Sequence, residues 1–136
     1  MQVKLLNNGA ILPERANRYA AGYDLYLPRD TQLEVGLNKV HIGVAMQIPP
    51  GHYGRIACRS SLAKAGMTVE AGVVDEDYRG EIIVMLRVRE AMEFKRGWKI
   101  AQIIITPYAT PQIIQVNYLG ETERGSGGFG STDNNI

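Results

Sequence analysis

The sequence predicts an all-β protein, a jelly-roll-like β-barrel or sandwich with one short helix and a flexible, glycine-rich C-terminal arm. Short segments rich in β-branched and aromatic residues recur at intervals of roughly 8 to 12 residues, and Gly, Pro, Asn and Asp separate them. Such spacing is typical of β-sandwiches and β-barrels, whereas βαβ units need helical segments between their strands.

Seven strands are expected along the chain. They read VKLL (3–6), YDLYL (23–27), KVHIGVAM (39–46), YGRIAC (53–58), EIIVMLRV (81–88), KIAQIIIT (99–106) and IIQVNY (113–118). The expected helix lies in SSLAKAG, where Ser60 is a candidate N-cap and Gly66 a stop signal.

The chain has 136 residues, 45% of them hydrophobic, which is the size of one globular domain. We expect a β domain over residues 1–123 and an arm over residues 124–136. A net charge of +1 without any run of Lys or Arg argues against nucleic-acid binding, so a nucleotide is a better candidate ligand than a polymer.

The single cysteine, Cys58, excludes an intrachain disulfide, and two distant histidines give no zinc constellation. The sequence has no signal-peptide pattern and no apolar run of about 18 residues. We therefore expect a cytoplasmic or nuclear protein that does not bind membranes.

The arm reads RGSGGFGST, from Arg124 to Thr132. Glycines leave backbone N–H groups open to an anion, while Arg124, Ser131 and Thr132 add charge and hydroxyl donors. Phe129 has no local packing partner, and a nucleobase is a flat surface on which it could stack. The segment is not a P-loop, since it has no lysine and no following helix; it is therefore either a mobile flap over a nucleotide or a flexible tail.

Three further polar clusters are candidates for a site. In GRIACRSSLA (54–63), Arg59 and Ser60 lie where a strand gives way to the helix, which favours an anion site; otherwise Ser60 only caps the helix and Arg59 is a solvated charge. In AGVVDEDYRGE (71–81), the acids from Asp75 are expected at a hairpin tip, either for turn chemistry or as a general base. In AAGYDLYLP (20–28), Asp24 is expected to be partly buried and to need a metal-bound water or an internal partner.

Together these clusters resemble the homotrimeric deoxyuridine triphosphatases (dUTPases, dUTP pyrophosphatases). The resemblance runs from about residue 20 to residue 132 and covers five motifs in order. They are AAGYDL, GRIACRSSLA, AGVVDEDYRGE, GWKIAQIIITP (97–107) and RGSGGFGST. Any one of these would be weak, whereas five in order with similar spacing are specific.

The resemblance implies a jelly-roll homotrimer with three active sites, each shared between subunits, that converts dUTP to dUMP and pyrophosphate. By position, Asp75 would be the general base and Asp24 would hold a Mg²⁺ ion through water. The implied contacts to substrate come from Arg59, Ser60, Ser61 and Gln102 for the phosphates, Tyr78 for the deoxyribose, the backbone of residues 69–75 (with Val69, Gly72 and Val74) for uracil, and Arg124, Phe129, Gly130, Ser131 and Thr132 of a closing arm.

Four residues depart from the family pattern. Cys58 and Ser61 replace the usual proline and glycine around the second motif, Trp98 stands where a small acidic residue is common, and Asp133 replaces a glycine after the fifth motif. Asp133 places a negative charge beside the residues implied to hold phosphate.

Two other functions remain alternatives. A deoxycytidine triphosphate deaminase of the same fold would need a glutamate within the strand GEIIVML, where this chain has Met85 and offers only Glu81 at the start. A trimeric binding protein without catalysis is the other, although it would not need Asp75, Asp24 and Phe129 together.

Overall fold

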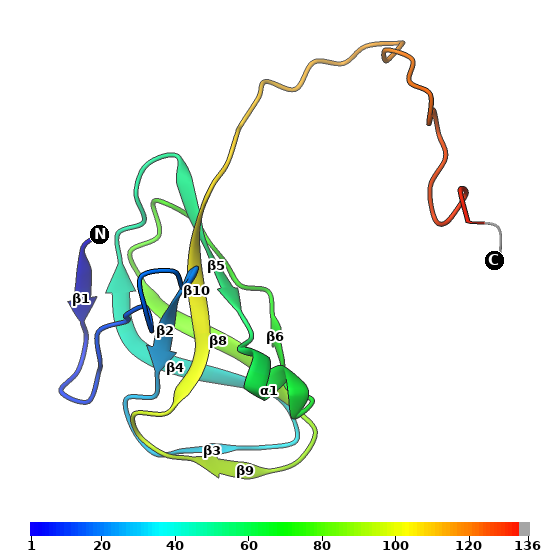
Figure 1. Ribbon diagram of the computed structural model, residues 1–136. Coiled ribbons are helices and arrows are strands. Elements are labelled where there is room, and N and C mark those ends of the chain that lie inside the picture. Colours follow the sequence, from blue (N-terminus) through cyan, green and yellow to red (C-terminus); the bar gives the residue numbers. More distant parts are fainter. Residues whose placement is uncertain (134–136) are drawn as a thin grey trace.

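The computed structural model describes residues 1–133 and has an all-β body that ends in a long, separate arm (Figure 1). Its strands are β1 (Val3–Leu5), β2 (Gly22–Tyr26), β3 (Thr31–Leu33), β4 (Gly36–Met46), β5 (His52–Ala57), β6 (Thr68–Glu70), β7 (Val73–Val74), β8 (Glu81–Val88), β9 (Met92–Phe94) and β10 (Lys99–Pro107). The predicted fold class is confirmed.

Two four-stranded sheets carry the core. One has the order β1-β4-β8-β6 and the other the order β2-β10-β5-β7, while β3 and β9 form a small ribbon. Every strand pairing is antiparallel. In β8 alternate residues are buried, from Ile82 to Val88, because a strand that covers a core on one face has a side-chain period of two.

The one helix among residues 1–133, α1 (Ser60–Lys64), follows β5 after a two-residue link. It ends in a Schellman motif, in which Gly66 N–H donates to the carbonyl of Ala63 and Met67 N–H to that of Leu62. Gly66 has φ +84, which confirms it as the stop residue. The predicted N-cap is wrong by one position, because Arg59 is the N-cap and no side chain caps the helix.

The predicted strand at residues 113–118 is wrong. These residues have no regular secondary structure, and their apolar side chains are exposed, Ile113 at 91% and Tyr118 at 90%. A β-rich sequence needs a partner strand, and this segment pairs with none of the strands in the described part of its own chain. Figure 1 shows the chain leaving the body after β10 and continuing as an arch that lies apart from the body.

Tyr108 fixes the point at which the chain leaves the body. Its N–H donates to the carbonyl of Gly51, its ring packs edge-on against Tyr53, and its hydroxyl donates to Glu76. That hydrogen bond to a carboxylate raises the pKa of Tyr108. The division into domains at residue 123 stays a prediction, and residues 134–136 of the predicted arm lie outside the described residues. No helix within residues 1–133 is long and apolar enough to cross a membrane.

Candidate functional site

A polar cavity of about 380 Å³ opens between β2, β10 and the start of α1. The register of β10 builds it, because Gln102 pairs with Asp24 on one side and with Ala57 on the other. The lining residues are Ala16, Ala20, Gly22, Asp24, Arg59, Ser60, Ser61, Lys99 and Gln102. Five residues that the sequence marked for phosphate or metal therefore meet here.

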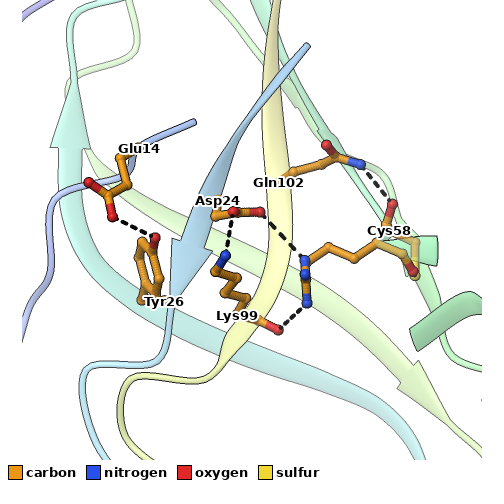
Figure 2. Close-up of polar contacts among 7 residues, drawn as sticks. Glu14, Asp24, Tyr26, Cys58, Lys99 and Gln102 are labelled. Carbon is orange, nitrogen blue, oxygen red and sulfur yellow. Dashed lines mark hydrogen bonds and ion pairs between the residues drawn. The ribbon is translucent and has the colours of Figure 1, made fainter. Parts of the chain in front are cut away.

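Asp24 is the buried charged residue of the described chain, with 7% of its surface exposed. Its Oδ2 lies 3.1 Å from Nζ of Lys99, and its Oδ1 lies 3.4 Å from Nε of Arg59. Figure 2 shows Lys99 reaching Asp24 from the neighbouring strand. A buried carboxylate needs such partners, so the predicted internal partner of Asp24 exists.

Gln102, which lines the polar cavity, is held in place by a hydrogen bond. Its Nε2 donates to the carbonyl of Cys58 over 3.1 Å (Figure 2). Gly22 leaves room for it, since a Cβ at that position would lie 2.2 Å from Oε1 of Gln102. Cys58 itself is partly buried, its thiol lies 3.5 Å from the carbonyl oxygens of Arg59 and Met67, and burial raises its pKa. The residue that replaces the family's proline therefore still ties the loop before Arg59 to the segment after α1.

A second cavity, of about 220 Å³, is mostly apolar and lies between β7, β8 and β5. A tight turn forms its wall, because Ala71 and Gly72 have φ of 57° and 105°. The Ile56 N–H donates to the carbonyl of Gly72 over 2.7 Å, which fastens this turn to β5. The lining residues are Ile56, Ala71, Gly72, Val73, Val74, Asp75, Tyr78, Glu81, Ile82, Ile83 and Met85.

The sequence predicted that the acids after β7 lie at a hairpin tip, and this prediction is wrong. β7 pairs with β5 and β8 pairs with β4 and β6, so residues 75–80 link two different sheets. Within this link, Glu76 is engaged by Tyr108 and by the Gly51 N–H, 3.1 Å from Oε2. Asp75 is exposed and lines the apolar cavity. The two acids therefore have different tasks: Glu76 holds the link, and Asp75 faces the cavity.

Tyr78 folds back over Gly80 beside the apolar cavity. Its hydroxyl donates to the carbonyl of Glu81 over 2.7 Å, and a Cβ on Gly80 would lie 2.5 Å from that hydroxyl. The Glu81 carboxylate accepts from the Gly43 N–H over 2.9 Å and lies 2.7 Å from Nδ1 of His41. The tyrosine ring is thus a fixed wall, and the glutamate beside it is already occupied.

The two cavities share no lining residue among those described, so one chain does not bring all the predicted site residues together. Gly72, Val74, Asp75 and Tyr78 lie at the apolar cavity, whereas Val69 packs against the core instead. Sequence reasoning missed Lys99. Its only signal in the sequence was its positive charge close to Gln102 in the fourth motif.

The arm residues lie apart from both cavities in a series of turns. Gly127 and Ser131 donate their N–H groups to the carbonyls of Arg124 and Gly128, and Asp133 donates to that of Gly130. Phe129 is fully exposed and has φ 51. Arg124, Ser131 and Thr132 are exposed as well.

Comparison with known proteins gives a consistent result. The family model described as dUTPase matches residues 8–133. The deoxyuridine 5'-triphosphate nucleotidohydrolase of Yarrowia lipolytica is 45% identical to this chain in an alignment that covers 97% of this chain and 88% of the relative.

Two solved structures are similar in fold. The dUTPase of Staphylococcus bacteriophage 80alpha with dUPNHPP is 29% identical, with a TM-score of 0.85 and 96% of each chain covered. A mutant dUTPase from phage phi11 of S. aureus, which coordinates a structural Mg(II) ion, is 25% identical, with a TM-score of 0.81 over 86% of this chain and 96% of its own.

Proposed function

The chain belongs to the dUTPase family and is a dUTP diphosphatase, and we propose that its Asp75 activates the water that attacks the α-phosphorus of dUTP in line. The products are dUMP and pyrophosphate. The observation that carries this mechanism is the position of Asp75, an exposed carboxylate at a mostly apolar cavity of about 220 Å³. A carboxylate serves as general base when it lies within hydrogen-bond reach of the attacking water.

The apolar cavity takes the nucleoside. The backbone around Gly72 reads the uracil edge, and the ring of Tyr78 packs against the deoxyribose, with its position fixed by the hydrogen bond to Glu81. A 2′-hydroxyl meets this ring, so UTP is excluded sterically. Cytosine leaves the polar groups built for uracil unpaired, and the thymine methyl group clashes with the tight turn.

The polar cavity takes the phosphate chain. Arg59, Ser60, Ser61 and Gln102 supply a guanidinium, two hydroxyls and an amide around one hollow. Phosphoryl and nucleotidyl transfer depend chiefly on positioning and on neutralisation of charge, and these groups provide both. No covalent nucleophile is needed.

The residues present fit Mg²⁺ as a cofactor bound mainly through substrate and water. Among residues 1–133, no group of three His, Cys, Asp or Glu side chains could form a protein cage for a metal ion. Mg²⁺ at phosphates usually keeps several waters and uses one or two carboxylates. Asp24 is a carboxylate in the polar cavity that could accept hydrogen bonds from such waters. When bound, Mg²⁺ neutralises phosphate charge.

A complete site combines subunits of a homotrimer. The nucleoside cavity of one subunit faces the polar cavity of another, and an arm closes over both with Phe129 on the uracil and Arg124, Gly130, Ser131 and Thr132 at the phosphates. Two observations support this arrangement: the two cavities have separate linings, and exposed apolar side chains lie along residues 113–119. Burial of those side chains on a neighbouring subunit would stabilise the assembly.

In the cell, this reaction limits uracil in DNA and supplies dUMP for thymidylate synthesis. The deaminase alternative is disfavoured, because Met85 stands at the cavity and Glu81 is held by His41 and the Gly43 N–H.

The experiment that tests the proposal compares the purified chain with Asp75→Asn, using dUTP and Mg²⁺. The unaltered chain is expected to release pyrophosphate and the variant to bind nucleotide without measurable turnover. Binding without pyrophosphate release from the unaltered chain would support a binding protein, and ammonia release from dCTP would support a deaminase.

A further inference from the structure

Lys99 is a cation in the polar cavity that none of the roles above uses. It lines this cavity together with Asp24, Arg59 and Gln102, and its side chain is 35% exposed. Its Nζ lies 3.1 Å from Oδ2 of Asp24, which is shorter than the 3.4 Å between Nε of Arg59 and Oδ1. Lys99 is therefore the nearer of the two cations that hold this carboxylate.

An irregularity in β10 puts Lys99 there. Gln102 pairs with Asp24 and Ala101 with Leu25, and regular pairing would then set Ile100 opposite Tyr26. The register shifts between Lys99 and Ala101, so Lys99 lies opposite Tyr26 instead. Tyr26 and Asp24 are two residues apart and share a face of β2.

The extra residue, Ile100, is fully buried in the core. The bulge therefore has two effects: it buries the side chain of Ile100, and it places Lys99 on the face of the sheet that carries Asp24. Bulges often re-aim a side chain beside an active site.

The ion pair between Lys99 and Asp24 also affects Arg59. Arg59 is the arginine proposed to bind phosphate, yet in this structure it forms an ion pair with Asp24, and its Nη1 donates to the carbonyl of Lys99 over 3.5 Å. If Arg59 leaves Asp24 to bind a phosphate, the Asp24 carboxylate needs a second cation beside it, because only a tenth of its side chain is exposed to water. A buried carboxylate left alone is costly.

We propose that Lys99 is a positioning residue: it holds Asp24 in place and thereby frees Arg59 to move onto the phosphate chain. This inference rests on the proposed function of the polar cavity. In Lys99→Met, Asp24 keeps Arg59 as its remaining cation, and every phosphate that binds has to break that ion pair.

The test is a double-mutant cycle on metal-free binding of the non-hydrolysable analogue dUpNHpp, measured by calorimetry in EDTA with 0.15 M salt. Lys99→Met is expected to raise the Kd about tenfold in the unaltered chain and less than about twofold in Asp24→Asn, since the neutral amide no longer competes for Arg59. A ratio between the two effects of at least about five supports the proposal.

A smaller ratio overturns it. Equal losses in both backgrounds would mean that Lys99 contacts phosphate directly, and no loss in either would mean that Lys99 has no role. Lys99→Arg keeps the charge and is expected to bind within about threefold of the unaltered chain. Lys95→Met is the matched control, because it removes an exposed lysine that pairs with Glu93 outside the cavity.

Two further measurements distinguish a loss of binding from a loss of folding and from a failure of the proposed function. Each variant is checked by urea unfolding, and Lys99→Gln replaces Lys99→Met if the latter does not fold. Pyrophosphate release by the unaltered chain tests the proposed function independently, so its failure and the failure of the Lys99 inference are distinguishable.

Discussion

Substitution of Gly72 by alanine tests whether the tight turn at residues 71–72 forms the nucleoside cavity. Gly72 has φ +105, which side-chain-bearing residues rarely adopt, and a Cβ there would lie 2.6 Å from the backbone oxygen of Ile56. Because that neighbour is backbone in the paired strand β5, it cannot simply rotate away. The turn or the strand has to shift.

Gly36 provides a matched control for the backbone term. It has φ +101, a Cβ there would meet no atom within 4 Å, and it lines neither cavity. Both alanine variants carry the strain of an unfavourable φ, about 1–3 kcal/mol each. Only Gly72→Ala adds the collision with Ile56, about 1–3 kcal/mol more, and displaces the cavity wall.

Urea unfolding and steady-state kinetics with dUTP measure the two effects. We expect Gly72→Ala to be the less stable variant and to raise KM about tenfold or more, because displacement of a binding wall by about 1 Å is enough to misplace the substrate. Gly36→Ala is expected to stay within about twofold in KM. If both variants lose stability equally and both keep the unaltered KM, this turn does not form the substrate cavity.

Four other predictions follow from the same structure. Gly80→Ala displaces the Tyr78 ring and is expected to narrow the preference for dUTP over UTP, measured as the ratio of the two kcat/KM values; an unchanged ratio would contradict the steric role of the ring. Deletion from Arg124 onward is expected to leave the circular dichroism spectrum intact while kcat/KM falls about a hundredfold; full activity would remove the arm from the site. Burial raises the pKa of Cys58, so its alkylation by iodoacetamide at pH 8 is expected to be slower than that of free cysteine and to accelerate as the pH rises; a faster reaction would refute it. Asp133→Gly removes a charge near the implied phosphate contacts and is expected to lower KM about two- to fivefold, whereas no change in KM would mean that Asp133 points away.

The sequence predicted the long strands because β-branched and aromatic residues are concentrated in them and turn residues separate them. β8 coincides with the predicted residues 81–88, and β10 extends one residue beyond the prediction. The short strands β3, β6, β7 and β9 were missed, since segments of two or three residues carry no period and their pairing depends on longer neighbours. Residues 113–118 have the composition of a strand, but they pair with no strand in the described part of the chain. Composition alone does not show whether a partner strand exists.

The polar cavity was predictable in composition but not in geometry. Asp24, Arg59 and Gln102 stood out as polar residues in motifs, and the structure brings them together. Lys99 did not, because only the register shift in β10 turns it toward Asp24. The separation of Asp75 from this cavity likewise depends on which sheet each strand joins, a property of topology that local sequence does not encode.

Hydrolysis of dUTP with Mg²⁺ in ¹⁸O-labelled water tests the central mechanism most directly, with the products analysed by mass spectrometry for the unaltered chain and for Asp75→Asn. In-line attack on the α-phosphorus predicts that the label enters dUMP and not pyrophosphate, and that the variant forms neither product. Label in pyrophosphate, or undiminished turnover by Asp75→Asn, would contradict the mechanism.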